Sequence, residues 1–178
     1  TTICCMPNTR PVNDRPEITQ EIIDRARKGS PVRVLPIASV SRGEQGQELS
    51  PMAELASAGA AGFSDDGQPI TSSALMRKAM EIAASLGLPL IDHCEEKSLS
   101  RNGVINEGRI SRLLQLGGIP AAAEEIMVAR DIILARDFGW PVHLAHLSTK
   151  GSVDLLAWAK AEGVPVTAEV TPHHLLLT

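Results

Sequence analysis

Three stretches of this sequence share one pattern, in which a short apolar run ends in side chains that bind metals well. The polar residues that end the three runs are Asp65-Asp66, Asp92-His93 and His146. A helical pattern follows each run before the next one begins. Side chains at the carboxyl end of a strand, just before the turn into a helix, occupy the place where α/β barrels carry their chemistry. The repetition therefore predicts an α/β fold with a metal site at the strand ends.

The alternation of strand and helix continues along the whole chain. Six strands are predicted, at residues 2–6, 32–37, 60–63, 88–91, 142–147 and 164–170. About five helices lie between them; four begin near Pro16, Pro51, Thr71 or Ser72, and Pro120, and the last follows a turn at residues 148–151. The strands are apolar on both faces, which is typical of parallel strands covered by helices on both sides.

The fold class that follows is α/β, as a partial (β/α)8 barrel containing about the second to the seventh strand. A complete barrel needs about 250 residues, whereas this chain has 178. An open doubly wound sheet is the alternative. The first strand is not followed by GxGxxG, so a dinucleotide-binding version of that sheet lacks its fingerprint.

Helical spacing predicts which side chains face the core. The expected inward residues are Ile18, Ile22, Ile23 and Ala26, then Leu75, Ala79, Ile82 and Leu86, then Ala122, Ile126, Ala129 and Ile133, and finally Val153, Leu156 and Ala157. Residues 41–49 are polar and predict a surface loop. Residues 95–119 are rich in glycine and form a long excursion, of the kind that is functional or disordered in most domains.

The ends of the sequence predict that residues 1–178 are the central part of one barrel domain. Residue 1 is Thr rather than Met, and residues 1–6 already read as a buried strand. The sequence stops in an apolar run at residues 175–178. Because domains usually end in exposed polar segments, we expect an internal piece that lacks the first and last strands.

Charge and composition exclude several classes of function. A net charge of -4 argues against a broad nucleic-acid surface. No apolar run is long enough to span a membrane, and no signal-peptide pattern opens the sequence. Cys4, Cys5 and Cys94 form no CxxC pair, which favours a reducing, cytoplasmic compartment.

Each candidate ligand also has a purely structural interpretation. A single histidine near an apolar strand is usually a core residue, but two at equivalent strand ends with a carboxylate at a third favour Zn²⁺. His143 and His146 lie three residues apart, so on one strand they face opposite sides. His146 is then the better ligand, and His143 is expected to pack toward the helices. Spacing alone does not choose between Asp65 and Asp66, and Asp-Asp-Gly is also a favourable turn.

Three further features carry weaker signals. His173 and His174 follow the sixth strand, where a polar loop is at least as good an interpretation as a ligand role. Cys94 is more typical of a small buried residue than of a nucleophile. The glycines at 101–109 lack the Gly-Lys-Ser/Thr ending of a phosphate loop.

Several motifs together resemble one known family, the class I bacterial-type dihydroorotases of the amidohydrolase superfamily. They are Cys5-Met6-Pro7-Asn8-Thr9, Phe63-Ser64-Asp65-Asp66-Gly67, Asp92-His93-Cys94-Glu95, Gly118-Ile119-Pro120-Ala121-Ala122-Ala123-Glu124-Glu125, His146-Leu147-Ser148-Thr149 and the stretch 168–175. The resemblance covers the whole chain. Single pieces also recur in hydantoinases and allantoinases, which carry a lysine where this chain has Ser-Asp-Asp.

The resemblance implies roles for four residues. Asp66 corresponds to a carboxylate that bridges two zinc ions, and His93 and His146 to the ligands of the second zinc. Asn8 corresponds to a substrate contact. The ligands of the first zinc would lie before Thr1, and the catalytic Asp would lie beyond Thr178, so no catalytic residue is expected in this stretch.

The implied activity of the intact protein is the reversible cyclisation of N-carbamoyl-L-aspartate to L-dihydroorotate, a step of pyrimidine biosynthesis. The implied cofactor is Zn²⁺, two ions per intact site. The implied assembly is a homodimer or a complex with aspartate carbamoyltransferase. Two alternatives remain: a related cyclic amidase, or a non-catalytic dihydroorotase-like subunit of that complex. The three retained strand-end ligands favour a catalytic protein over the latter.

Overall fold

A computed structural model describes residues 1–176 of the chain. The chain divides into two compact units, the first of residues 1–93 and the second from Cys94 onward. Both units alternate parallel strands with helices, as the sequence pattern predicts. The expectation about the last apolar residues falls partly on Leu177 and Thr178, which lie outside the described residues.

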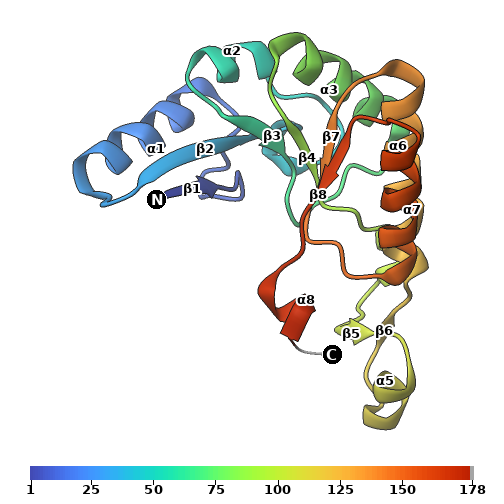
Figure 1. The fold of residues 1–178 in the computed structure, drawn as a ribbon. Helices are drawn as coiled ribbons and strands as arrows, with labels where there is room; N and C mark the ends of the chain where they lie inside the picture. Colours follow the sequence, from blue (N-terminus) through green and yellow to red (C-terminus); the bar gives the residue numbers. More distant parts are fainter. Residues whose placement is uncertain (177–178) are drawn as a thin grey trace. The chain divides into compact units, whose positions relative to one another are not determined.

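Four parallel strands form the sheet of the first unit, in the order β1-β2-β3-β4 (Figure 1). The strands are β1 (Thr2–Cys5), β2 (Arg33–Ser39), β3 (Gly62–Ser64) and β4 (Leu90–Asp92). The helices are α1 (Pro16–Gly29), the 3-10 turn η1 (Arg42–Glu44), α2 (Met52–Ser57) and α3 (Ser73–Leu86). All four predicted strands of this unit are therefore confirmed, with small shifts at their ends.

Helix α3 shows how local sequence sets an element's limits. The Ser72 side chain caps its start by accepting a hydrogen bond from the Leu75 N–H. Gly87 ends it in the left-handed conformation, with φ 66°. The helix buries a stripe of small and flexible side chains, Met76, Ala79, Met80 and Ala83. Ala79 was predicted to face inward, whereas Leu75, Ile82 and Leu86 lie only half-buried beside the stripe.

The first strand is not buried as the sequence predicts. Thr2 to Cys4 are exposed, and half of the Ile3 surface is accessible. β1 lies at the edge of the sheet and, among the described strands, pairs with β2. An apolar run alone does not reveal that a strand lies at an edge, because burial depends on what covers it.

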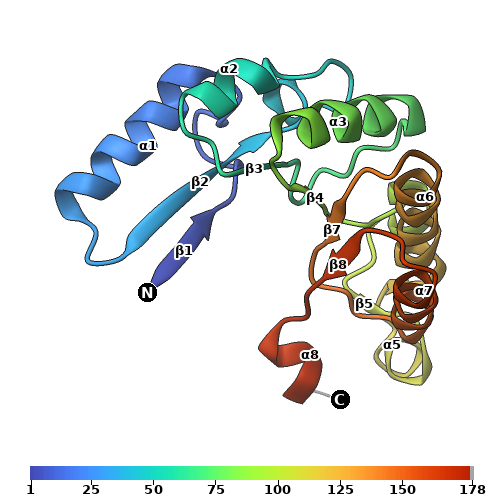
Figure 2. The ribbon, with the colours of Figure 1, turned by 45° about the horizontal axis from the view of Figure 1, so that its top comes forward.

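The second unit contains the parallel pair β7 (Val142–Leu144) and β8 (Val166–Ala168), which helices cover (Figure 2). Helix α6 (Ala122–Phe138) packs beside α7 (Lys150–Ala161), and they contact β7 and β8 respectively. The short helix α8 (Pro172–Leu176) follows β8. Both predicted strands of this unit are confirmed, but each is shorter than expected.

The predicted inward faces of α6 and α7 are wrong. Ile126 and Ile133 are 51% and 47% exposed, and Val153 on α7 is 48% exposed. The buried residues of the two helices are Ala123, Met127, Val128, Asp131, Ile132 and Ala135 on α6, and Ser152 and Ala159 on α7. Both helices carry apolar residues around most of their circumference, so spacing alone could not identify the packed face.

Two stretches predicted as loops contain more structure than expected. Residues 95–119 hold two short helices, α4 (Lys97–Ser100) and α5 (Arg109–Leu114), and a parallel pair, β5 (Ile105–Asn106) and β6 (Gly118–Ile119). Within residues 41–49, Ser41 and Glu44 are buried. No helix in the described part of the chain has the length and apolar character needed to cross a membrane.

Candidate metal centre

Asp66 and His93 come together in the first unit, as their strand-end positions predict. Asp66 follows β3, and His93 follows the neighbouring strand β4. The Asp66 Oδ1 lies 3.9 Å from the His93 Nδ1, and both side chains are about one-fifth to one-quarter exposed. Two atoms that each lie about 2.1 Å from one zinc ion are at most about 4.2 Å apart. The pair therefore fits a single ion, with an oxygen and a nitrogen donor that both suit Zn²⁺.

The structure separates the roles of Asp65 and Asp66, which spacing left open. The Asp65 carboxylate faces back into the first unit and binds the chain that follows β2. It accepts hydrogen bonds from the Val40 N–H at 2.7 Å and the Ser41 N–H at 3.0 Å. The Ser41 hydroxyl also donates to it. These bonds occupy Asp65 fully, so Asp66 is the residue of the two whose carboxylate lies beside His93.

Glu44 lies in the same acidic region and was missed by the sequence analysis. Its residue surface is only 8% exposed, and its Oε1 has no hydrogen-bond partner among the described residues. Burial, together with the charges of Asp65, Asp66 and Asp14, raises the pKa of Glu44 to about 7. Burial also raises the pKa of Asp65 to about 6, although its hydrogen bonds from Ser41 and Val40 act in the opposite direction. Negative charge is therefore costly here, and a bound cation would relieve it.

His146 belongs to the second unit, where it follows β7 in an unusual backbone conformation. The strand ends at Leu144, two residues before His146. The Glu169 N–H donates to the Leu144 carbonyl at 3.1 Å, and the Leu147 N–H donates to the Glu169 carbonyl at 2.9 Å. Ala145 and His146 thus form a bulge opposite one residue of the neighbouring segment. His146 has φ 40°, in the left-handed region that favours glycine.

The bulge corrects the prediction for His143. Its Nδ1 lies 2.8 Å from the Thr167 hydroxyl on β8, and its Nε2 lies 3.7 Å from a Glu169 carboxylate oxygen. Its side chain is 25% exposed, whereas the flanking Val142 and Leu144 are buried. His143 therefore does not pack toward the helices as expected. The argument from a three-residue step fails as well, because regular alternation stops at Leu144.

The structure also describes the four remaining candidates, which are Asn8, His173, His174 and Cys94. Asn8 is exposed in the turn after β1. The His173 Nε2 lies 3.1 Å from the Thr171 hydroxyl, and the two rings of His173 and His174 contact edge to face. Cys94 is buried, with its thiol 3.9 Å from the Asp131 carboxylate. Its burial agrees with the interpretation of Cys94 as a structural residue.

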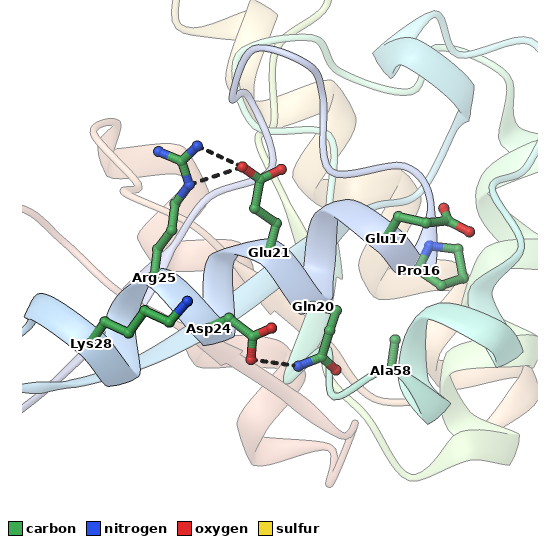
Figure 3. A pocket seen from close by; sticks show the side chains of 8 residues that line it. All are labelled: Pro16, Glu17, Gln20, Glu21, Asp24, Arg25, Lys28 and Ala58. Carbon is green, nitrogen blue, oxygen red and sulfur yellow. Dashed lines mark hydrogen bonds and ion pairs between the residues drawn. The ribbon is translucent and has the colours of Figure 1, made fainter.

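A shallow hollow on the outer surface of α1 is unrelated to the candidate ligands (Figure 3). Its lining residues are Pro16, Glu17, Gln20, Glu21, Asp24, Arg25, Lys28 and Ala58. The Glu21 carboxylate accepts a hydrogen bond from Arg25 at 2.6 Å, and Asp24 accepts one from Gln20 at 2.9 Å. Four of the eight lining residues thus pair with one another, and none of the eight is a candidate ligand.

Sequence reasoning also gave no role to Glu124, although it lies in one of the motifs that carry the family resemblance. The structure places its carboxylate at the start of α7, against Ser148 and Thr149. The partners lie 24 and 25 residues away in the sequence. A local pattern contains no signal for such a contact.

Comparison with protein families gives one match that spans most of the chain. A model of the family described as dihydro-orotase-like matches residues 1–152. Among curated proteins, a dihydroorotase of Pelotomaculum thermopropionicum is 52% identical over 178 residues, which are 100% of this chain and 42% of the relative. A dihydroorotase of a Sulfurihydrogenibium species is 53% identical, with the same coverage. The chain thus spans about two-fifths of the length of these relatives.

Solved structures similar to this chain include two hydantoinases. The L-hydantoinase of Arthrobacter aurescens has a TM-score of 0.80 at 20% identity, covering 100% of this chain and 41% of the other. The D-hydantoinase of a Thermus species has a TM-score of 0.68 at 26% identity, covering 99% and 40%. These similarities confirm the predicted fold class, an α/β segment of an amidohydrolase-type barrel.

Proposed function

Because the chain belongs to the dihydro-orotase-like family, we propose that it forms part of a zinc-dependent dihydroorotase. The reaction is the reversible cyclisation of N-carbamoyl-L-aspartate to L-dihydroorotate in pyrimidine biosynthesis. The observation that carries the proposal is the Asp66–His93 pair at neighbouring strand ends. The relatives that are about half identical to this chain and carry the name dihydroorotase support the choice of reaction.

The metal ligands in this proposal are Asp66, His93 and His146. Asp66 and His93 are supported by their 3.9 Å separation and by the donor types that zinc prefers. His146 is supported by its position after β7, the equivalent place in the second unit, and by its half-buried side chain. Asn8, exposed after β1, is the proposed substrate contact, since its amide can donate a hydrogen bond to a substrate carboxylate.

The acidic residues around the proposed metal site have separate roles. Zinc bound by these ligands supplies a Lewis acid that polarises the substrate carbonyl and activates water. Asp66 balances the positive charge, while Asp65 keeps the preceding backbone in place through Val40 and Ser41. The acidic surroundings that raise the pKa of Glu44 strengthen the attraction for cations.

Partners, metal count and location complete the proposal. Two zinc ions per intact site are expected; Asp66, His93 and His146 would hold the second, and the family resemblance gives Asp66 a share in holding the first. The assembly is a homodimer or a complex with aspartate carbamoyltransferase. A cytoplasmic location is supported by the three cysteines, whose spacing includes no CxxC pair.

The related cyclic amidases are the second candidate. The solved structures named hydantoinase support the fold, but at 20% and 26% identity they favour no particular substrate. The Ser64-Asp65-Asp66 sequence, in place of a strand-end lysine, favours dihydroorotase.

The test uses the full-length natural protein that contains this sequence. After removal of metal with a chelator and addition of Zn²⁺, the protein should cyclise N-carbamoyl-L-aspartate and hydrolyse dihydroorotate, with little turnover of hydantoin or allantoin. Asp66→Asn should abolish zinc-dependent turnover, and Asp137→Asn, an exposed carboxylate change on α6, should not. Preferential turnover of hydantoin or allantoin would contradict the proposed reaction and identify a related cyclic amidase. If none of these substrates is turned over, the result favours a non-catalytic dihydroorotase-like subunit.

A further inference from the structure

The segment after His146 is held by a carboxylate from another helix. Glu124, in the first turn of α6, reaches the two residues that immediately precede α7. Its Oε2 accepts hydrogen bonds from the Ser148 N–H at 2.9 Å and the Ser148 hydroxyl at 2.6 Å. Its Oε1 accepts one from the Thr149 N–H at 3.0 Å and lies 3.0 Å from the Thr149 hydroxyl. One carboxylate thus fixes two consecutive residues through both backbone and side chain.

These contacts lie directly beside a strained position. His146 has φ 40°, and the left-handed conformation is strained for a residue that carries a side chain. Such a conformation persists only where the surroundings hold the chain on both sides. Glu169 holds Leu144, before the histidine, and Leu147, after it, through its backbone N–H and carbonyl. Glu124 holds the next two residues, Ser148 and Thr149.

The flanking side chains define the direction of His146 further. Ala145 and Leu147 are each 2% exposed, so both neighbours of the histidine are packed into the core of the second unit. With its neighbours anchored and the following turn fixed, the backbone sets the direction of the Cα–Cβ bond from which the imidazole projects. A change at residues 148 and 149 would therefore be transmitted to His146 through a single buried residue.

We propose that Glu124 is a positioning residue for His146, which it holds in the orientation needed to bind metal. The inference rests on the proposed function, because it takes His146 to be a zinc ligand. Glu124 does not touch the metal in this proposal. It acts by fixing the backbone that carries the ligand, and outer contacts of this kind commonly change metal affinity about 10-fold to 100-fold when they are lost.

The chemistry of the contact requires a carboxylate rather than any polar group. All the groups that face Glu124 are donors, so both of its oxygens act as acceptors. Burial alone would raise the pKa of Glu124, but hydrogen bonds from Ser148, Ser152 and Thr149 outweigh it and hold the pKa below its usual value. Glutamine presents an NH₂ group to one set of these donors, so Glu124→Gln should break half of the contact with almost no change in volume.

A role limited to helix capping is the competing explanation. Thr149 already caps α7 by accepting a hydrogen bond from the Ser152 N–H at 3.2 Å. If Glu124 only adds to this cap, its loss lowers the stability of the protein without changing the metal site. Metal affinity and the spectrum of a bound metal report on the ligand geometry, so they distinguish the two explanations.

The experiment compares four variants of the full-length protein with the parent: Glu124→Gln, Glu124→Ala, His146→Ala and the control Asp137→Asn. Asp137 lies on the same helix as Glu124, is 49% exposed and pairs with Arg136. Affinity for Co²⁺ is measured by competition with a chelator, and the visible spectrum of the Co²⁺ protein is recorded. Thermal unfolding of each metal-free protein measures stability separately.

The two Glu124 variants should bind Co²⁺ about tenfold more weakly than the parent, with altered visible bands, and Asp137→Asn should match the parent. Parental affinity and spectrum in Glu124→Gln, with or without a lower unfolding temperature, would overturn the inference. Glu124→Gln keeps the volume of the side chain, so it remains informative if Glu124→Ala does not fold. Parental Co²⁺ affinity in His146→Ala would instead overturn the proposed ligand set, and thus identifies a failure of the proposed function.

Discussion

At the scale of single residues, chemically identical neighbours have different roles. Asp65 and Asp66 are adjacent carboxylates at the end of one strand. The first is occupied by donors from residues 40 and 41, and the second lies beside His93. The difference arises from direction, because successive side chains at a strand end point to opposite sides.

This division of roles predicts opposite effects for two matched substitutions. Asp65→Asn places an NH₂ group among the donors of Val40 and Ser41 and should lower the free energy of unfolding by about 1–3 kcal/mol. Asp66→Asn should leave the metal-free protein near its parental stability and abolish tight Zn²⁺ binding. Thermal unfolding of the metal-free proteins and zinc titration measure the two properties. Lost zinc binding in Asp65→Asn with parental binding in Asp66→Asn would reverse the assignment.

The two histidines near β7 allow a second comparison. His146→Ala removes a proposed zinc ligand and should abolish dihydroorotase activity and lower zinc content. His143→Ala removes a partly exposed hydrogen bond to Thr167 and should cost about 0.5–1.5 kcal/mol of stability, with zinc retained. Metal analysis and turnover of both purified full-length variants provide the test. Equal zinc loss in both variants would mean that His143 also contributes to the metal site.

At the scale of elements, the segment 41–49 shows how polar residues become part of a buried structure. Ser41 is fully buried, donates to Asp65 and accepts a hydrogen bond from the Gly46 N–H at 2.8 Å. The Gly43 N–H donates to Asp14 at 3.0 Å. These contacts tie the segment to the sheet and bring Glu44 into an acidic interior.

The raised pKa of Glu44 predicts how stability depends on pH. Between about pH 4.5 and 7 the folded protein keeps a proton on Glu44 that the unfolded chain has lost. Folding is therefore less favourable as pH rises through this range. Glu44→Gln carries no charge and should raise the thermal midpoint of the metal-free protein at pH 8, by about 2–4 °C for each kcal/mol gained. At pH 4.5 the variant and the parent should differ little.

The matched control for this prediction is Glu48→Gln. Glu48 lies in the same segment, but its side chain is 73% exposed beside Arg42. Its substitution should leave the pH dependence of the parent unchanged. If Glu44→Gln unfolds at the same temperature as the parent at pH 8, ionisation of the buried Glu44 carboxyl is not what lowers the stability of the parent. Asp65, whose pKa is raised from 3.8 to about 6, is present in all these proteins and adds its own loss of stability as pH rises between those two values.

At the scale of the whole molecule, apolar surface remains exposed in both units. Ile3 on the edge strand β1 is 50% exposed, Leu113 on α5 is 72% exposed, and Leu175 and Leu176 on α8 are 68% and 78% exposed. Exposed strand edges and apolar patches favour association between chains.

Residues 1–178 expressed alone should therefore form oligomers or precipitate, whereas the full-length protein should be monodisperse in a defined state. Size-exclusion chromatography with light scattering measures this directly. A soluble monomer of residues 1–178 that unfolds cooperatively would contradict the expectation that these residues are only the central part of one domain.

The local sequence was sufficient for the order of elements. Alternating apolar runs and helical spacings predicted six of the described strands, β1 to β4, β7 and β8, because backbone preferences and capping act over a few residues. Ser72 and Gly87 at the two ends of α3 are examples. The local pattern also identified Asp66 and His93 as candidates, since their positions at strand ends are set by the same short-range rules.

Only the tertiary structure decided the orientation and the hydrogen-bond partners of each candidate side chain. The role of Asp65, the bulge at His146 and the contacts of Glu124 depend on partners 22 to 25 residues distant in the sequence. The packed faces of α6 and α7 could not be predicted either, since apolar residues surround both helices and burial depends on what lies against them. Residue type and spacing determine what a side chain can do, whereas its orientation and its partners are fixed only when distant segments pack together.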